Sequence, residues 1–110
     1  MSEDELLAAG YRAFKPNGHD RFDMLYSKRV TDEVGIRYAV HVRFWDFRKY
    51  GAEEDGWDAE VISNDGADWW GGPLWLKTSC RDKSVAEVER WADQLWTRLA
   101  LNYYERWEES

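Results

Sequence analysis

Strict alternation between residues 36 and 44 constrains the fold of this chain more than any other feature. Ile36, Tyr38, Val40, Val42 and Phe44 share one parity, while Arg37, Ala39, His41 and Arg43 take the other. A period of two places successive side chains on opposite faces of a β-strand, so one face of this strand should be buried. The chain therefore needs a sheet, and an apolar surface to cover it.

The C-terminal third of the chain supplies that surface. Ser84 and Glu87 form a capping-box pattern, which predicts the start of a helix. Apolar residues then recur at helical spacing: Val88, Trp91, Ala92, Leu95, Trp96, Leu99 and Tyr103, through to Trp107. The pattern predicts an amphipathic helix of about six turns. We expect it to lie across the sheet and to form the core with the apolar parity of residues 36–44.

Weaker patterns complete the predicted fold. Ser2 and Glu5 indicate a short N-terminal helix. Further strands are predicted from Phe22, over Trp57–Ile62, and from Leu74 to about Cys80, separated by turn residues. The predicted fold class is α+β: a single domain over residues 1–110, in the order α-β-β-β-β-α. It has a four-stranded, mostly antiparallel sheet, a short N-terminal helix, and a long C-terminal amphipathic helix packed on one face.

Composition and charge restrict the partners. The chain has 44% hydrophobic residues and a net charge of −7, so it should fold despite its acidity. The charge disfavours direct nucleic-acid binding and anionic membranes, and it favours a protein with a basic surface. The N-terminus shows no secretion signal, no apolar run is long enough to span a bilayer, and Cys80 is the only cysteine. These features predict a cytoplasmic protein.

An acidic block over residues 53–68 is the strongest candidate for a binding surface. It holds seven carboxylates and no Lys or Arg, and it runs into adjacent tryptophans. Carboxylates spaced along a strand and its loops can imitate a nucleic-acid backbone, and tryptophans are enriched at binding hot spots. The predicted partner-binding residues are Glu53, Glu54, Asp55, Asp58, Glu60, Asp65, Asp68, Trp69 and Trp70. The alternative is a solvated acidic edge that serves only solubility, which applies if Trp69 and Trp70 are buried.

Basic residues in the predicted hairpin leave a second question open. They are Lys28, Arg29, Arg37, Arg43, Arg48 and Lys49. Their charges either pair across the strands with the acidic block, or form a second face that contacts another partner or a second copy of the chain.

Chemistry-bearing motifs are scarce. Carboxylate pairs such as Asp58 with Glu60 would share one strand face, and with flanking tryptophans they suggest a glycosidase cleft. However, 110 residues leave little room for a deep cleft, and any acidic chain offers such pairs by chance. His19, His41 and Cys80 have no metal-ligand spacing, and a buried structural thiol is the simplest role for Cys80. We therefore expect no enzyme activity, no metal and no cofactor.

Two segments in the first 45 residues carry a resemblance. Residues 10–16 (GYRAFKP) and 26–33 (YSKRVTDE), followed by Gly35, Arg37 and Tyr38, resemble small uncharacterised proteins encoded by bacteriophages and prophages. In size, acidity and lack of an enzyme motif the chain is also similar to anti-CRISPR proteins. That likeness is one of character, so it carries no functional residues to this chain.

These observations predict a phage-type inhibitor in the host bacterial cytoplasm. The acidic block would bind a protein with a basic surface, such as a CRISPR effector complex, and compete with nucleic acid. Two alternatives stay open. One is a small carbohydrate-binding module that uses tryptophans as a stacking platform. The other is a structural or regulatory phage protein that forms a homodimer through Trp45, Phe47 or the terminal helix.

Overall fold

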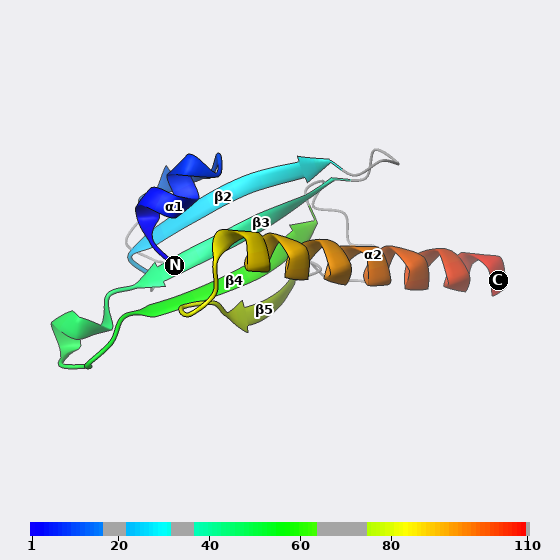
Figure 1. Ribbon diagram of the computed structural model, residues 1–110. Coiled ribbons are helices and arrows are strands. Elements are labelled where there is room, and N and C mark those ends of the chain that lie inside the picture. The colour runs from blue at the N-terminus through cyan, green and yellow to red at the C-terminus, as the bar shows by residue number, and fades with distance from the viewer. Residues whose placement is uncertain (17–21, 32–36, 64–74, 110) are drawn as a thin grey trace.

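A computed structural model describes the backbone of residues 1–16, 22–31, 37–63 and 75–109, and their side chains except those of residues 37, 63, 75, 76 and 99–109. The elements in chain order are α1 (Glu3–Ala8), β1 (Arg12–Phe14), β2 (Met24–Thr31), β3 (Arg37–Trp45), the 3-10 helix η1 (Phe47–Tyr50), β4 (Gly56–Ser63), β5 (Trp75–Ser79) and α2 (Val85–Glu109). Figure 1 shows α1 and α2 on the same side of the sheet.

The described strands form one antiparallel sheet in the order β1-β2-β3-β4-β5. The predicted α+β class, the meander and the two terminal helices are confirmed. The predicted count of four strands was one too low, because β1 was not recognised. β1 has only three residues, all exposed, so it shows no apolar alternation. It exists because it pairs with the next strand, with Ala13 opposite Tyr26 of β2.

The core lies between the helices and one face of the sheet. The predicted parity of β3 is buried at Tyr38, Val40 and Val42, while Ile36 lies outside the described residues. From α2, the apolar stripe contributes Val85, Val88, Ala92 and Trp96, and α1 contributes Leu6. Trp96 is only 2% exposed and stacks on Tyr38 with ring centroids 5.4 Å apart. The two helices therefore close the same core.

Serine caps start both helices, as the sequence predicts. Ser2 Oγ accepts a hydrogen bond from the Glu5 amide, and Ser84 Oγ accepts one from the Glu87 amide at 3.1 Å. These bonds satisfy amides that a helix cannot pair internally. Gly10, with φ +94°, follows α1 and turns the chain into β1.

The opposite sheet face has no helix on it among the described residues (Figure 1). We call it the uncovered face. Strand register places Arg43 beside Asp58, and His41 beside Glu60, on this face. At one end of the sheet, the hairpin formed by β3, η1 and β4 projects beyond the helices and beyond β5 (Figure 1). This projecting hairpin carries the first part of the acidic block.

Candidate functional site

Asp58, a predicted partner-binding residue, is engaged within the sheet. Arg43 Nε donates to Asp58 Oδ1 at 2.7 Å, and Arg43 Nη2 donates to Asp58 Oδ2 at 2.9 Å. The guanidinium also lies 5.6 Å from the centroid of the Trp45 ring and 5.8 Å from that of Phe22. A planar bidentate pair that also lies beside two aromatic rings is held firmly. Asp58 therefore offers a partner only the acceptor capacity that Arg43 leaves.

Glu60, also predicted to bind a partner, is 7% exposed and lies between His41 and Lys77 in the register of the sheet. Its carboxylate Oε1 is 4.0 Å from His41 Nδ1. Burial raises the pKa of Glu60, although Arg43 and Lys77 oppose that shift. Burial and the nearby Arg43 lower the pKa of His41. Both shifts favour the uncharged forms, and the burial of Glu60 leaves little of its carboxylate accessible to a partner.

Ser27, His41 and Glu60 form one cross-strand row on the uncovered face. Their order is that of a serine hydrolase triad, with the carboxylate nearest His41 Nδ1. However, the amides of β2, β3 and β4 belong to strands within the sheet ladder. The described residues around the row therefore supply no pair of amide donors for an oxyanion.

The remaining described carboxylates of the block lie at the projecting hairpin. Glu54 forms an ion pair with Arg81, which lowers the pKa of Glu54. Asp55 Oδ1 is 3.9 Å from Arg48 Nε. Glu53 is exposed, and so is Tyr50, at 81%. Asp65, Asp68, Trp69 and Trp70 lie outside the described residues, so their predicted role stays a prediction.

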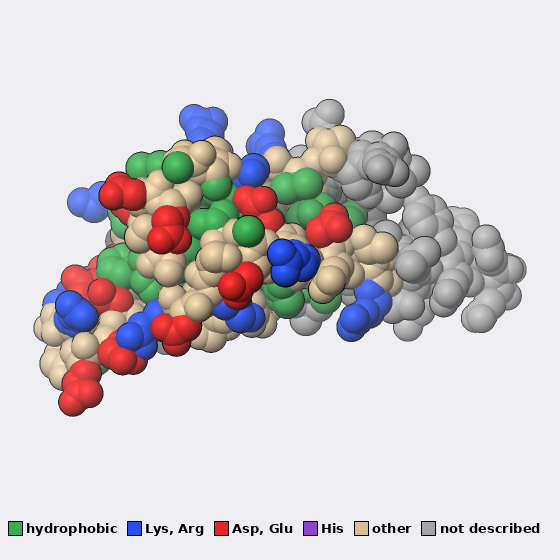
Figure 2. Space-filling model, in the orientation of Figure 1, with side chains coloured by type: hydrophobic (Ala, Val, Ile, Leu, Met, Phe, Trp, Pro, Cys, Tyr) green, Lys and Arg blue, Asp and Glu red, His purple; other side chains and the backbone are tan. Residues whose placement is uncertain are grey.

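These contacts bear on the question left open by the basic hairpin. Arg43 and Arg48 pair with carboxylates of the acidic block, which is the cross-strand alternative. Lys28 pairs instead with Glu89 of α2 at 3.1 Å, and Lys49 pairs with Asp23. Figure 2 shows acidic and basic side chains mixed over the helix-covered face and the hairpin, not separated into two patches.

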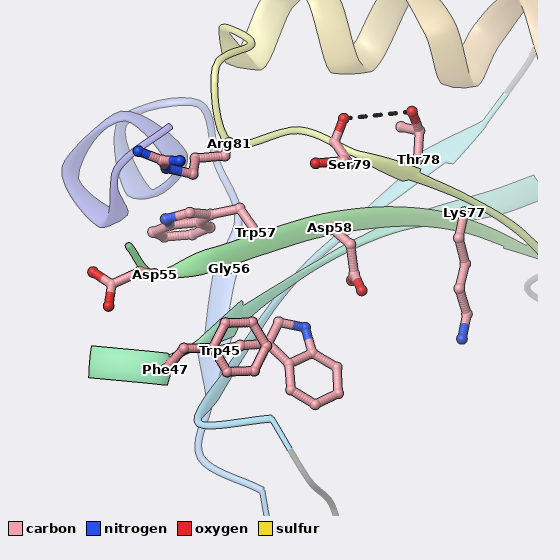
Figure 3. Close-up of a pocket in the computed structure, with 10 residues that line it drawn as sticks. All are labelled: Trp45, Phe47, Asp55, Gly56, Trp57, Asp58, Lys77, Thr78, Ser79 and Arg81. Atoms are coloured by element: carbon pink, nitrogen blue, oxygen red, sulfur yellow. Dashed lines mark hydrogen bonds between the residues drawn. The ribbon is translucent and has the colours of Figure 1, made fainter. Parts of the chain in front are cut away.

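A pocket of about 600 Å³ opens at the base of the projecting hairpin. Figure 3 shows Trp45, Phe47, Asp58 and Lys77 on one side of β4, and Trp57 and Arg81 on the other. The lining residues are Trp45, Phe47, Asp55, Gly56, Trp57, Asp58, Lys77, Thr78, Ser79 and Arg81. Aromatic rings therefore stand beside charged and hydroxyl groups in one concave surface.

Gly56 explains how two of these rings are placed. It pairs with Trp45 across the sheet, and a Cβ built on it would lie 2.4 Å from Phe47 Cε2. Only glycine leaves space for the Phe47 ring against the backbone of β4. There Phe47 stacks on Trp45, with ring centroids 5.8 Å apart and an interplanar angle of 22°. We call these two rings the aromatic platform.

Sequence reasoning did not find this pocket, although one signal was available. Both parities near the end of the predicted second strand are apolar, with Trp45 outside the core parity, and a glycine begins the next strand. The strand register places Trp45 opposite Gly56 and so brings these features together in the pocket.

Cys80 is fully buried, and burial raises its thiol pKa to about 11, as expected for a structural thiol. Among the described residues, no cluster of His, Cys, Asp or Glu is arranged to hold a metal ion. In that same part of the chain, no helix has the length and apolarity needed to cross a membrane. Comparison with models of protein families, with curated proteins and with solved structures finds no match to this chain.

Proposed function

We propose that this chain is a binding protein of the phage-inhibitor type, which docks on a basic, nucleic-acid-binding protein surface and competes with the nucleic acid there. The observation that carries the proposal is the projecting hairpin, where Tyr50 is 81% exposed and Glu53 and Glu54, a few positions later, are exposed too. An exposed aromatic ring on the same hairpin as exposed carboxylates combines contact area with charge that attracts Lys and Arg.

The internal ion pairs limit which carboxylates of the acidic block can contact a partner. Asp58 and Glu60 are held by the sheet, so they serve the partner less than the hairpin carboxylates do. Glu53 and Glu54 are both exposed, and the Arg81 partner of Glu54 is itself at the surface. Surface ion pairs contribute little to stability, so a partner can displace Arg81 at small cost. The hairpin therefore carries the proposed contact.

A CRISPR-type effector complex is the specific partner in this proposal. Its support is the sequence resemblance of the first 45 residues to small phage proteins and the likeness in size and acidity to anti-CRISPR proteins. Such a complex has rows of Lys and Arg that hold phosphates, which matches carboxylates on a projecting hairpin. Competition with nucleic acid follows if both ligands need the same cations.

The test uses two double variants with equal change of charge. Glu53→Lys with Glu54→Lys reverses the hairpin, whereas Glu87→Lys with Asp93→Lys reverses exposed positions on α2. Tagged forms of the full chain would capture proteins from host lysate, and fluorescence polarisation would follow displacement of labelled nucleic acid from the captured complex. We expect the hairpin variant to lose capture and displacement, and the α2 variant to keep both. Equal capture by both variants, or capture without displacement, would overturn the proposal.

A further inference from the structure

The pocket beside the projecting hairpin is not needed for the proposed protein contact. We propose that it binds a neutral saccharide, with a sugar ring stacked on the aromatic platform of Trp45 and Phe47 and its hydroxyl groups bonded to Asp58 and Lys77. The inference rests on the placement of the rings, their fixation, and the balance of charge in the pocket.

The aromatic platform is a stacked pair with an outer ring face. Figure 3 shows Trp45 and Phe47 next to each other, and their rings stack with centroids 5.8 Å apart and an interplanar angle of 22°. Phe47 is 42% exposed and Trp45 is partly exposed, so neither ring is sealed in the core. The negative face of an aromatic ring attracts the polarised C–H groups on one side of a sugar ring.

The platform is fixed before any ligand arrives. Phe47 lies in the space that Gly56 leaves. Trp45 is held by the Arg43 guanidinium and by a T-shaped contact with Phe22, whose ring centroid is 6.1 Å from that of Trp45. Rings held in this way lose little side-chain freedom on binding, which favours even a small ligand.

Charge in the pocket is balanced, which selects against an ionic ligand. Asp58 is paired with Arg43, Arg81 with Glu54, and Lys77 lies beside Glu60 in the sheet. Asp58 keeps acceptor lone pairs, and an ammonium can donate up to three hydrogen bonds. Ser79 adds a hydroxyl in register with Asp58. Donors and acceptors without net charge, beside a stacking surface, suit a polyhydroxylated neutral ring.

The experiment records ¹H–¹⁵N spectra of the full chain during titration with D-glucose, D-galactose, D-mannose, N-acetyl-D-glucosamine and their oligomers. An array of neutral and charged glycans widens the screen. We expect a neutral saccharide to shift the Trp45 indole signal and the Asp58 and Ser79 amides. Loss of one stacking ring in Phe47→Ala should weaken that binding about tenfold, and Phe47→Tyr should restore it.

Tyr50→Ala is the matched control, because Tyr50 lies on the same hairpin but not in the pocket lining. It should leave saccharide binding unchanged, as should Glu53→Lys, which changes hairpin charge without touching the pocket lining, so the inference and the proposed function can fail separately. The inference is overturned if no neutral saccharide shifts these signals, if Phe47→Ala binds as the parent does, or if only charged glycans or a proline-rich peptide bind.

Discussion

Arg43 and Asp58 face each other across β3 and β4 and share two hydrogen bonds, of 2.7 Å and 2.9 Å. Their side chains are 12% and 25% exposed, so the pair is partly withdrawn from water. The pair lies where the uncovered face meets the pocket, and it holds Trp45 through the guanidinium. Asp58, which was predicted to bind a partner, is therefore engaged first by Arg43 within the sheet.

We expect Arg43→Ala to lower the free energy of unfolding by about 2 kcal/mol, because it leaves a half-buried carboxylate without its donor. Asp58→Ala should cost a similar amount. The double variant should cost clearly less than the two losses together, since neither group is then left alone. Urea unfolding of the four proteins measures the cycle. Additive losses would mean that the pair contributes no coupling.

Gly56 and Phe47 are coupled by shape and not by charge. A methyl group at Gly56 would lie 2.4 Å from Phe47 Cε2, so Gly56→Ala should force the ring off the strand and destabilise the fold by about 1–3 kcal/mol. In a Phe47→Ala background the same change should cost much less, because the obstructing ring is gone. Thermal unfolding compares the two backgrounds. An equal cost in both would assign the effect to the backbone of β4.

The fold was predictable where local pattern and burial agree. The alternation in β3 and the stripe of α2 each mark a face that has to be buried, and Val40 and Ala92 are buried as expected. β1 and η1 carry no such pattern. Arg12–Phe14 is a strand only because β2 offers an edge to pair with, and that pairing leaves no pattern within the three residues themselves.

The candidate site was less predictable, because it depends on register. The acidic block is visible in the sequence, but the pairing of Asp58 with Arg43 and of Glu60 with His41 depends on how β3 aligns with β4. A shift of one residue would move Asp58 to the other face. The pocket lining likewise comes from five separate segments of the chain. Composition shows that aromatic residues are abundant, but it does not show which of them lie together.

Cys80 provides a readout of core integrity. Its side chain is fully buried, and burial raises the thiol pKa to about 11, so at pH 8 the folded protein should contain very little thiolate. We expect a thiol-reactive reagent such as Ellman's reagent to modify Cys80 only through unfolded molecules. The rate should therefore rise with urea in parallel with the unfolded fraction. Rapid modification in the absence of urea would show that the α2 side of the core opens locally.

His41 tests the electrostatics of the uncovered face. Burial and Arg43 lower its pKa, whereas Glu60 Oε1, 4.0 Å from Nδ1, would raise it if that carboxylate were charged. We expect burial to win, because His41 is largely withdrawn from water and its 4.0 Å separation from Glu60 Oε1 is too long for a hydrogen bond. The folded pKa of His41 is then below the unfolded value of about 6.5, so the unfolded chain binds more protons.

Stability attributable to His41 should therefore be present above about pH 6.5 and be lost as pH falls through the folded pKa, with a slope of at most about 1.4 kcal/mol per pH unit. His41→Gln removes the titration and keeps a polar side chain, so the difference in unfolding free energy between parent and variant isolates this residue from Glu60. As pH falls from about 7.5 to about 5.5, the unfolding free energy of the parent should decrease relative to that of the variant. If the unfolding free energy of the parent increases relative to that of the variant, the His41–Glu60 ion pair outweighs burial. The uncovered face is then more charged than its contacts imply.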